Sequence, residues 1–479
     1  MIVKAIKRIL PKGLMARGVT VLAGSNAVGQ VIALAVSPLL TRLYTPEDFG
    51  LLAVYMSLTT ILGVIVCLRY ERAIVLPEAD TDGVTVAVLC LLSVLLSTLL
   101  TLIGILFFAE QLTSLLSTPQ LKPFLWALPI SVLLLGMFTA FRFWAIRQNA
   151  YGQIGQARIK QVLASVFVQI AAYPLGAFGL IGGQLANQGA GSLSLGKRLF
   201  AQPGIRAVSV AGIWAMAKRY KDLPLVSVWS GLLNRTSAQL PTLMFAALFG
   251  PAVAGLYALA TRVVNTPAGV MSGALNSVLF SNAASASRQG TLGKLTSNTH
   301  RRLVAVAMPP LLLLALISPQ LFAWVFGQQW LQSGQFAQWV VILVYFSICA
   351  APLVMIFTVL EKQLHDFIFQ ALLTATRFAM ILWGAHLESA LIAIALYCVG
   401  SGVCYMILLF WIAVLVGEGP GMVVKPLLSA IPVSVLTSAP VLVALYLDVS
   451  VMLSLLAVAL STILVGIHVY RQLRLSYKK

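Results

Sequence analysis

Two arginines, Arg235 and Arg262, lie inside long apolar stretches of the chain. An arginine at the centre of a membrane helix costs about 2.5 to 3.5 kcal/mol on insertion scales, so its side chain should face a cavity or a partner. A guanidinium binds phosphate through two parallel hydrogen bonds and stays charged when partly desolvated. Both arginines therefore suit an anionic ligand such as a lipid pyrophosphate, unless they only bond helix carbonyls or extend to water.

Polar residues accompany these arginines at helical spacing. The face that carries Arg235 is small or polar, because positions i−4, i+4 and i+7 hold Gly231, Gln239 and Thr242. Asn and Gln also join membrane helices to one another, which is the alternative interpretation of the uncharged residues. The residues that we expect to line a hydrophilic, cationic cavity and bind the ligand are Arg235, Arg262, Gln239, Asn265, Asn26, Gln30, Asn276 and Gln188.

Further arginines lie at the predicted cytoplasmic ends of two helices. Arg69 and Arg72 flank Glu71 after the second helix, and Arg142 and Arg147 end the fourth. We interpret these four arginines as an inner gate that receives an anionic headgroup. A salt-bridge cluster beside the membrane is the alternative interpretation.

Composition places these residues in a membrane protein. Hydrophobic residues make up 60% of the 479, charged residues only 9%, and mean hydropathy is +0.95, whereas soluble domains have about 25% charged residues. The net charge of +19 does not indicate nucleic-acid binding, because the basic residues fall in short gaps between apolar runs. The five cysteines fall within apolar stretches without Cys-x-x-Cys spacing, so they are interpreted as packing residues.

A transmembrane helix needs about 20 predominantly apolar residues, and fourteen stretches qualify. The sixth stretch is the weakest, since it contains Gln184, Asn187 and Gln188. The fourteen predicted spans are 19–40, 49–68, 84–108, 123–141, 161–178, 180–196, 225–249, 254–282, 303–326, 336–360, 367–384, 390–416, 427–447 and 451–470.

The distribution of Lys and Arg predicts the orientation of these spans. With the N-terminus inside, most of the 32 basic residues fall in cytoplasmic segments, as the positive-inside rule requires. Both termini are then cytoplasmic, and residues 1–18 form a basic amphipathic segment on the membrane surface. Removing the sixth span alone would invert every later segment, whereas removing the fifth and sixth together would not. Fourteen spans are therefore favoured, with twelve as the alternative.

A short repeat indicates two related halves. Residues 45–53 and 250–258 share a Pro-x-x-x-Gly-Leu-x-Ala pattern at an offset of 205, each after a long span on the outer side. Two six-helix lobes around a central cavity follow, as in transporters built from parallel repeats. The predicted all-α organisation is a surface segment (1–18), an N-lobe (19–199), a cytoplasmic linker (200–224), a C-lobe (225–416) and two extra helices with a basic tail (417–479).

Several kinds of chemistry are disfavoured. Residues 191–198 nearly match a phosphate-binding loop, but Arg198 stands where a hydroxyl should hold magnesium and no strand precedes them. Glu361 and His365 lack the two-histidine arrangement of a zinc helix. The short outer loops leave little room for a polymerase or ligase, and the acidic residues all fall in loops or at span ends, which disfavours a proton-driven exporter of cationic drugs. We expect no catalytic residues, metal or cofactor.

Four segments resemble a known family. They are LTRLYTPEDFGLLAVY (40–55), RYERAIVLP (69–77), YKDLPLVSVWSGLLN (220–234) and FGPAVAGLYALATRVV (249–264). They are similar to the bacterial polysaccharide transporter family of O-antigen and exopolysaccharide repeat-unit flippases, whose superfamily also holds multidrug and toxin extrusion exporters and lipid II flippases. Arg262 lies within a resembling segment, whereas Arg235 stands where that family would be expected to have a small or polar residue.

The resemblance implies a flippase of the bacterial inner membrane. Its expected substrate is an undecaprenyl-pyrophosphate-linked oligosaccharide, moved from the cytoplasmic to the periplasmic leaflet by alternating access between the lobes. Expected partners are the lipid bilayer and, for the polymer pathway, a polysaccharide polymerase and a chain-length regulator. The alternatives are a multidrug exporter, which a cationic ligand would indicate, and a lipid II flippase.

Overall fold

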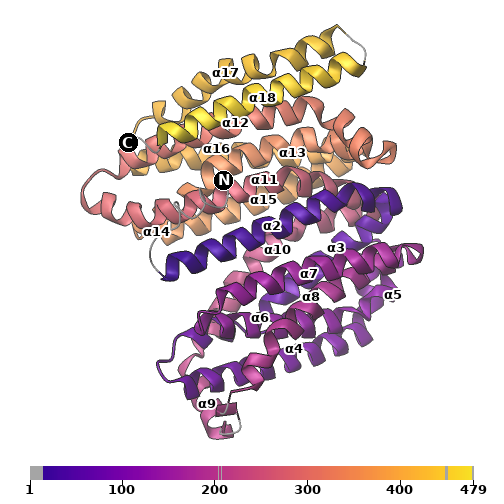
Figure 1. Cartoon of the computed structure of the whole chain (residues 1–479), viewed down its shortest axis with the longest axis vertical. Helices are drawn as coiled ribbons and strands as arrows, with labels where there is room; N and C mark the ends of the chain where they lie inside the picture. Colours follow the sequence, from indigo (N-terminus) through magenta and orange to yellow (C-terminus); the bar gives the residue numbers. More distant parts are fainter. Residues whose placement is uncertain (1–13, 203, 206–207, 448–450, 477–479) are drawn as a thin grey trace. The chain divides into compact units, whose positions relative to one another are not determined.

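The computed structural model describes residues 14–202, 204–205, 208–447 and 451–476, although not the side chains of 14–20, 23, 267–282, 284, 451 and 473–476. This part of the chain is almost entirely helical and contains no strand (Figure 1). It forms two compact units that divide between Ala258 and Leu259. We refer to them as the first and second units.

The first unit is a bundle of long helices joined by short turns. Helix α7 packs against α2 and α8, helix α6 packs against α4 and α8, and α10 packs against α3. The helices are α2 (Leu14–Leu43), α3 (Pro46–Ile65), α4 (Asp80–Leu115), α5 (Lys122–Leu125), α6 (Leu128–Arg147), α7 (Tyr151–Ala171), α8 (Ala177–Phe200), α9 (Val210–Arg219), α10 (Val228–Phe249) and the start of α11 (Pro251–Arg288).

The second unit contains the rest of α11 and the later helices. Helix α12 packs against α13, α17 and α18, and α16 packs against α13 and α15. Figure 1 shows α17 and α18 as a yellow pair. The helices are α12 (Leu292–Phe326), α13 (Leu331–Ala350), α14 (Met355–Val359), α15 (Gln363–His386), α16 (Ala390–Leu415), α17 (Gly421–Tyr446) and α18 (Val451–Ser476).

The prediction of a polytopic helical membrane protein is confirmed. Among the described residues, ten helical segments are long and apolar enough to cross a membrane. Each of the fourteen predicted spans coincides with a helix, but α7, α8, α10 and α11 are not among these ten. Polar residues lower the hydropathy of α7, α8 and α10, and several of them belong to the candidate site described below. The number fourteen itself stays a prediction.

Some boundaries differ from the predicted ones. Helix α7 begins at Tyr151, ten residues before its predicted apolar span, because a helix continues beyond the residues that contact lipid. The predicted linker 200–224 contains helix α9, whose Ser209 hydroxyl accepts a hydrogen bond from the Gly212 N–H at the N-cap. Most of the predicted surface segment 1–18 lies outside the described residues, and the division into two six-helix lobes stays a prediction.

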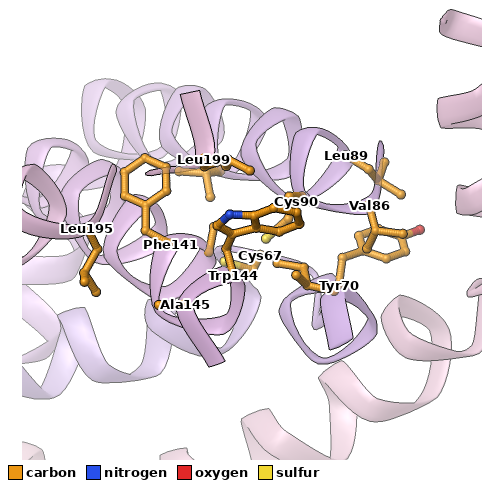
Figure 2. Packing of buried hydrophobic residues seen from close by; sticks show 14 of the residues in the cluster. Cys67, Tyr70, Val86, Leu89, Cys90, Phe141, Trp144, Ala145, Leu195 and Leu199 are labelled. Carbon is orange, nitrogen blue, oxygen red and sulfur yellow. The ribbon is translucent and has the colours of Figure 1, made fainter. Parts of the chain in front are cut away.

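The core of the first unit surrounds Trp144 of α6. Figure 2 shows the Trp144 ring beside Cys67 and Cys90, with Phe141 and Leu199 on its other side. These residues come from α4, α6, α8 and the turn after α3, and all are at most 1% exposed. The five cysteines are buried and free. This packing fixes α6, so that Arg142 and Arg147 project from a rigid helix.

The two copies of the predicted repeat contact each other at the starts of α3 and α11. Thr45 caps α3 in a capping box with Asp48, and Pro46 begins the helix. A Cβ atom on Gly50 would lie 1.7 Å from the carbonyl oxygen of Pro251, and one on Gly255 would lie 1.9 Å from that of Pro46. Only glycine permits so close an approach of two backbones.

Candidate functional site

Arg69 is positioned by a turn of left-handed backbone. Leu68 and Arg69 have φ angles of 48° and 65°, a conformation that costs about 1 to 3 kcal/mol for each non-glycine residue. This turn leads from α3 into the short 3-10 helix η1 (Tyr70–Val75). The Arg69 guanidinium lies against Gly231 of α10, where a Cβ atom would stand 1.8 Å from Nη2. The absence of a side chain at Gly231 makes room for this arginine.

Glu71 is the carboxylate around which several arginines gather. Its side chain is 7% exposed, and an Oε1 atom lies 3.9 Å from Nη1 of Arg69. Burial raises the pKa of Glu71, although a backbone hydrogen bond and the charges of Arg69, Arg72 and Arg142 act in the opposite direction. The pKa of Arg69 is lowered by burial and then by the nearby Arg72. One carboxylate therefore faces an excess of positive charge.

Arg142 and Arg158 extend this positive region across α6 and α7. Arg142 lies over the rings of Phe138 and Phe143, 5.9 and 5.5 Å from their centroids, and it interacts electrostatically with Glu71 and Arg158. Nη1 of Arg158 lies 3.4 Å from Oε1 of Gln161. We name Arg69, Arg72, Arg142, Arg158 and Arg235, together with Glu71, the arginine cluster.

Several buried atoms of the arginine cluster lack a hydrogen-bond partner among the described residues. They are the Nε atoms of Arg69, Arg142 and Arg158 and Oε2 of Glu71. A buried charged donor without a partner is costly, so each such atom in a native protein needs an explanation such as water or a bound ion. Three unpaired guanidinium donors in one region favour an anion.

Arg235 joins the cluster from α10. Its charge acts on Arg69, and its own side chain is exposed. Gln239, one turn further on, accepts a hydrogen bond of 3.0 Å at Oε1 from the Ser57 hydroxyl of α3. Gly231, one turn before Arg235, lies against Arg69. The predicted polar face of α10 is therefore directed toward α3 and the residues that follow it.

Amides line the contact between α7 and α8. Gln161 and Gln188 are 2% and 3% exposed, and Oε1 of Gln188 has no hydrogen-bond partner among the described residues. Nδ2 of Asn187 donates to the Gln161 carbonyl at 3.2 Å, and Gly191 leaves space for the Gln161 side chain. These groups add neutral donors and acceptors to the region around Arg158.

Arg147 is held differently from the other predicted gate residues. Its guanidinium donates to the carbonyl oxygens of Ile74, Pro77, Glu78 and Ala79 and to the Asp80 carboxylate, at 2.6 to 3.3 Å. These acceptors extend from the end of η1 through the loop to the first residue of α4. Arg147 therefore fastens this loop, whereas Arg69, Arg72 and Arg142 gather around Glu71.

The remaining predicted site residues lie elsewhere. Asn26 and Gln30 are exposed on α2, where Gly29 between them lies against Arg158. Arg262 is partly buried and Asn265 is exposed, and both belong to the second unit. The side chain of Asn276 lies outside the described residues. Within the described part of the chain, no group of three or more His, Cys, Asp or Glu residues could hold a metal ion.

Sequence reasoning missed Arg158 and Gln161. Gln161 begins the predicted span 161–178, whereas Arg158 lies just before it in a segment predicted to be cytoplasmic. A signal was present, since Arg158, Gln161, Ser165 and Gln169 follow i, i+3, i+7 and i+11 spacing on one helical face. The arginine cluster thus combines residues expected in an inner gate with residues expected in a cavity.

A comparison with protein families identifies the chain. Residues 39–335 match the model of a family described as "Polysaccharide biosynthesis protein". The chain belongs to this family. The matched residues include every member of the arginine cluster and the helices that carry them.

Named relatives of this polysaccharide biosynthesis protein are distant. The succinoglycan biosynthesis transport protein ExoT of Rhizobium meliloti (strain 1021) is 24% identical over 314 residues, which cover 61% of this chain and 58% of the relative. The lipopolysaccharide biosynthesis protein WzxC of Escherichia coli (strain K12) is 24% identical over 306 residues, which cover 61% of this chain and 59% of WzxC. The chain therefore spans less than two thirds of the length of both relatives.

Solved structures show the fold that this polysaccharide biosynthesis protein shares. The lipid II flippase MurJ in an inward closed conformation superposes with a TM-score of 0.70 at 12% identity, covering 94% of this chain and 99% of MurJ. An inward-facing multidrug resistance transporter of the MATE family gives a TM-score of 0.63 at 14% identity, covering 83% of this chain and 94% of the transporter. The likeness confirms the transporter fold expected from the sequence.

Proposed function

We propose that this polysaccharide biosynthesis protein is a flippase that moves polyprenyl-pyrophosphate-linked oligosaccharide repeat units across the bacterial inner membrane. The arginine cluster is the observation that carries this proposal. Three of its five guanidinium groups act on one buried carboxylate and the other two each act on one of these three, and three of the five keep a buried Nε without a hydrogen-bond partner among the described residues. A pyrophosphate supplies several charged acceptor oxygens for such donors.

The substrate would meet residues of different kinds along its length. Arg69 and Arg72, at the predicted cytoplasmic end of α3, would receive the pyrophosphate, and Arg142 and Arg158 would hold it further inside. The amides of Gln161 and Gln188 would hydrogen-bond sugar hydroxyls, while the polyprenyl tail stays in lipid. No covalent bond changes, so the protein acts as a transporter and not as an enzyme.

Translocation by alternating access requires an outer end that closes and opens. The crossing of α3 and α11 at Gly50 and Gly255 lies at the predicted outer ends of both helices. Its close backbone contact would seal the outer side in the present conformation, and it would separate when the substrate leaves. The name of ExoT as a transport protein of succinoglycan biosynthesis supports this role, and WzxC is named as a protein of lipopolysaccharide biosynthesis.

A cationic-drug exporter fits this unit less well. The MATE transporters share the fold, but fold alone does not define the ligand. Glu71 is the only carboxylate in the arginine cluster, and arginines outnumber it. An anionic ligand is therefore favoured over a cationic one, and lipid II remains an outcome of the test because it also carries a pyrophosphate.

The test is a deletion of the gene in its native host, followed by complementation. Wild type and the variants Arg142→Gln/Arg158→Gln and Arg142→Lys/Arg158→Lys are compared, with the exposed Arg219→Gln of α9 as a matched control. Mass spectrometry of lipid-linked sugars in each leaflet is the readout. The Gln pair should leave a complete repeat unit in the cytoplasmic leaflet, and the control should restore export.

Other results would assign the protein differently. Accumulated lipid II would identify a cell-wall precursor as the substrate. Normal surface polysaccharide without an accumulated intermediate in the deletion strain, with no redundant transporter present, would contradict the proposal. The abundance and melting temperature of each variant in membranes show whether a lost function reflects lost folding, and the Lys pair retains charge if the Gln pair does not fold.

A further inference from the structure

A cavity in the second unit is lined by residues of α12, α17 and α18. Its volume is about 370 Å³, within the range of about 300 to 1,000 Å³ that is usual for small-molecule sites. Its apolar lining residues are Ala305, Pro309, Ala430 and Val433. Its polar lining residues are Asn298, Arg301, Arg302, Ser429, His468 and Gln472.

The charge of this cavity is positive. Arg301 and Arg302 are exposed, and neither has an ion pair with an acidic residue in the described part of the chain. No Asp or Glu is among the residues that line the cavity. Glu418, at the same end of the unit, lies against Gly293 instead. Arg301, Arg302 and Asn298 bring hydrogen-bond donors to the cavity, whereas the Ser429 hydroxyl donates to the carbonyl oxygen of Pro426, and the two charged guanidinium groups suit an anion.

His468 fixes one wall of the cavity. Its Nε2 lies 3.1 Å from the carbonyl oxygen of Ala305, and because a carbonyl only accepts, Nε2 is the donor. This hydrogen bond joins α18 to α12. The cavity is therefore built by helices that are fastened to each other and is not a gap between loose ends.

The position of the cavity along the helices indicates a membrane interface. Its residues lie near 302, 429 and 470, where the sequence predicts that three helices reach the cytoplasmic surface. Leu428, Ile431 and Ile467 are exposed on the same two helices, α17 and α18, and provide an apolar surface for lipid chains. Basic pockets between transmembrane helices on the cytoplasmic side bind anionic headgroups.

We propose that this cavity binds the phosphate of a lipid headgroup in the cytoplasmic leaflet. Arg301 and Arg302 hold the phosphate oxygens, Asn298 hydrogen-bonds the headgroup, and the apolar lining residues contact the first carbons of the lipid. A phosphodiester of an anionic phospholipid and a polyprenyl pyrophosphate share this chemistry. The proposal concerns the second unit alone and does not depend on the flippase function.

The test uses the full chain purified in detergent, with binding followed by native mass spectrometry. Probes are phosphatidylglycerol, phosphatidylcholine, undecaprenyl pyrophosphate and inorganic phosphate. The variant Arg301→Gln/Arg302→Gln removes the two lining charges, and Arg288→Gln/Lys294→Gln removes two exposed charges that line no part of this cavity. Loss of charged hydrogen bonds should weaken anionic-lipid binding about tenfold or more in the first variant. The control should retain wild-type affinity.

A second variant tests the cavity without changing charge. Ser429→Trp fills the cavity from α17 and should weaken binding similarly. If only undecaprenyl pyrophosphate responds to these variants, the lipid phosphate is that of a polyprenyl lipid; if phosphatidylglycerol responds, it is that of a phospholipid. Wild-type binding of both phosphatidylglycerol and undecaprenyl pyrophosphate that is no tighter than binding of phosphatidylcholine, or an equal loss in the Arg288/Lys294 control, would overturn the proposal. Unchanged binding in the Ser429→Trp variant would also overturn it.

Discussion

Gly50 and Pro251 are separated by about two hundred positions in the sequence, yet the backbone of one lies directly against the carbonyl oxygen of the other. The relationship is reciprocal, because Gly255 lies in the same way against Pro46. An offset of 205 converts Pro46 into Pro251 and Gly50 into Gly255. The repeated Pro-x-x-x-Gly pattern therefore marks one symmetric contact in which each copy contacts the other.

Replacing Gly50 by alanine should force α3 and α11 apart, because the new methyl group would overlap the Pro251 carbonyl. Overpacking of this kind costs about 1 to 3 kcal/mol, so the melting temperature of the purified protein should fall. Gly104→Ala is the matched control, since no atom lies within 4 Å of a Cβ atom there. Equal stability of the Gly50 and Gly104 variants would show that the crossing is looser than described.

Arg147→Ala should destabilise the first unit without changing the affinity of folded protein for a pyrophosphate lipid. The Arg147 side chain is 9% exposed and donates to the carbonyl oxygens of Ile74, Pro77, Glu78 and Ala79 and to the Asp80 carboxylate. Leaving these acceptors unpaired should lower the free energy of unfolding by about 2 to 4 kcal/mol. Lysine lacks the planar fork, so Arg147→Lys should recover only part of this loss.

Thermal unfolding in detergent measures this effect, with the exposed Lys160→Ala as the control. An Arg147→Ala variant with the melting temperature of the wild type would show that the loop holds its position without the hydrogen bonds from Arg147. A variant that melts with wild type but binds pyrophosphate lipid weakly would instead return Arg147 to the predicted inner gate.

Glu71 should make the stability of the protein depend on pH. Burial raises the pKa of Glu71 in the folded state, so the folded protein binds this proton more tightly than the unfolded chain. The stability that it contributes is complete below the unfolded pKa of about 4.3 and is lost as pH rises through the folded pKa. Glu71→Gln cannot titrate and should remove this part of the pH dependence.

Melting temperature measured from about pH 4 to 7 tests the effect of Glu71. Glu78→Gln, a change of an exposed carboxylate in the loop after η1, should keep the wild-type slope. If Glu71→Gln also keeps it, another group is responsible for the pH dependence.

The helices could be predicted because a membrane helix is determined by the local composition of its own segment, which must be apolar over about 20 residues. Every predicted span contains a helix, and the polar face of α10 follows from spacing alone, since Gly231, Arg235 and Gln239 recur every four residues. The positions of the helix ends are predicted less accurately. Helix α7 continues through polar residues to Tyr151, because backbone hydrogen bonding does not require an apolar side chain.

The roles of individual arginines could not be predicted, because they depend on contacts between residues that are distant in the sequence. Arg142 and Arg147 lie about one and a half turns apart on α6, yet one faces Glu71 and aromatic rings while the other fastens a loop. Nothing in their local sequence distinguishes them. Likewise, Gly231 could be assigned to a polar face but not identified as the space that admits Arg69.

Arg235 is the residue of the arginine cluster whose replacement should affect translocation most clearly without affecting the stability of the protein. Its side chain is exposed, so Arg235→Ala should change the stability of the protein by no more than about 0.5 kcal/mol. Its charge acts on Arg69, and under the proposed function it helps to bind the pyrophosphate. Arg235→Ala should therefore leave membrane insertion and melting temperature intact while slowing delivery of the repeat unit to the periplasmic leaflet.

Complementation of the deletion strain measures that delivery, with Arg219→Ala as an exposed control on α9. Arg235→Lys keeps the charge but not the planar fork, so it should recover part of the activity if phosphate is the ligand. Translocation at the wild-type rate in Arg235→Ala would mean that the residue only extends to water. Partial recovery by lysine, with none by glutamine, would support the proposal by showing that the substrate requires a positive charge at this position of α10.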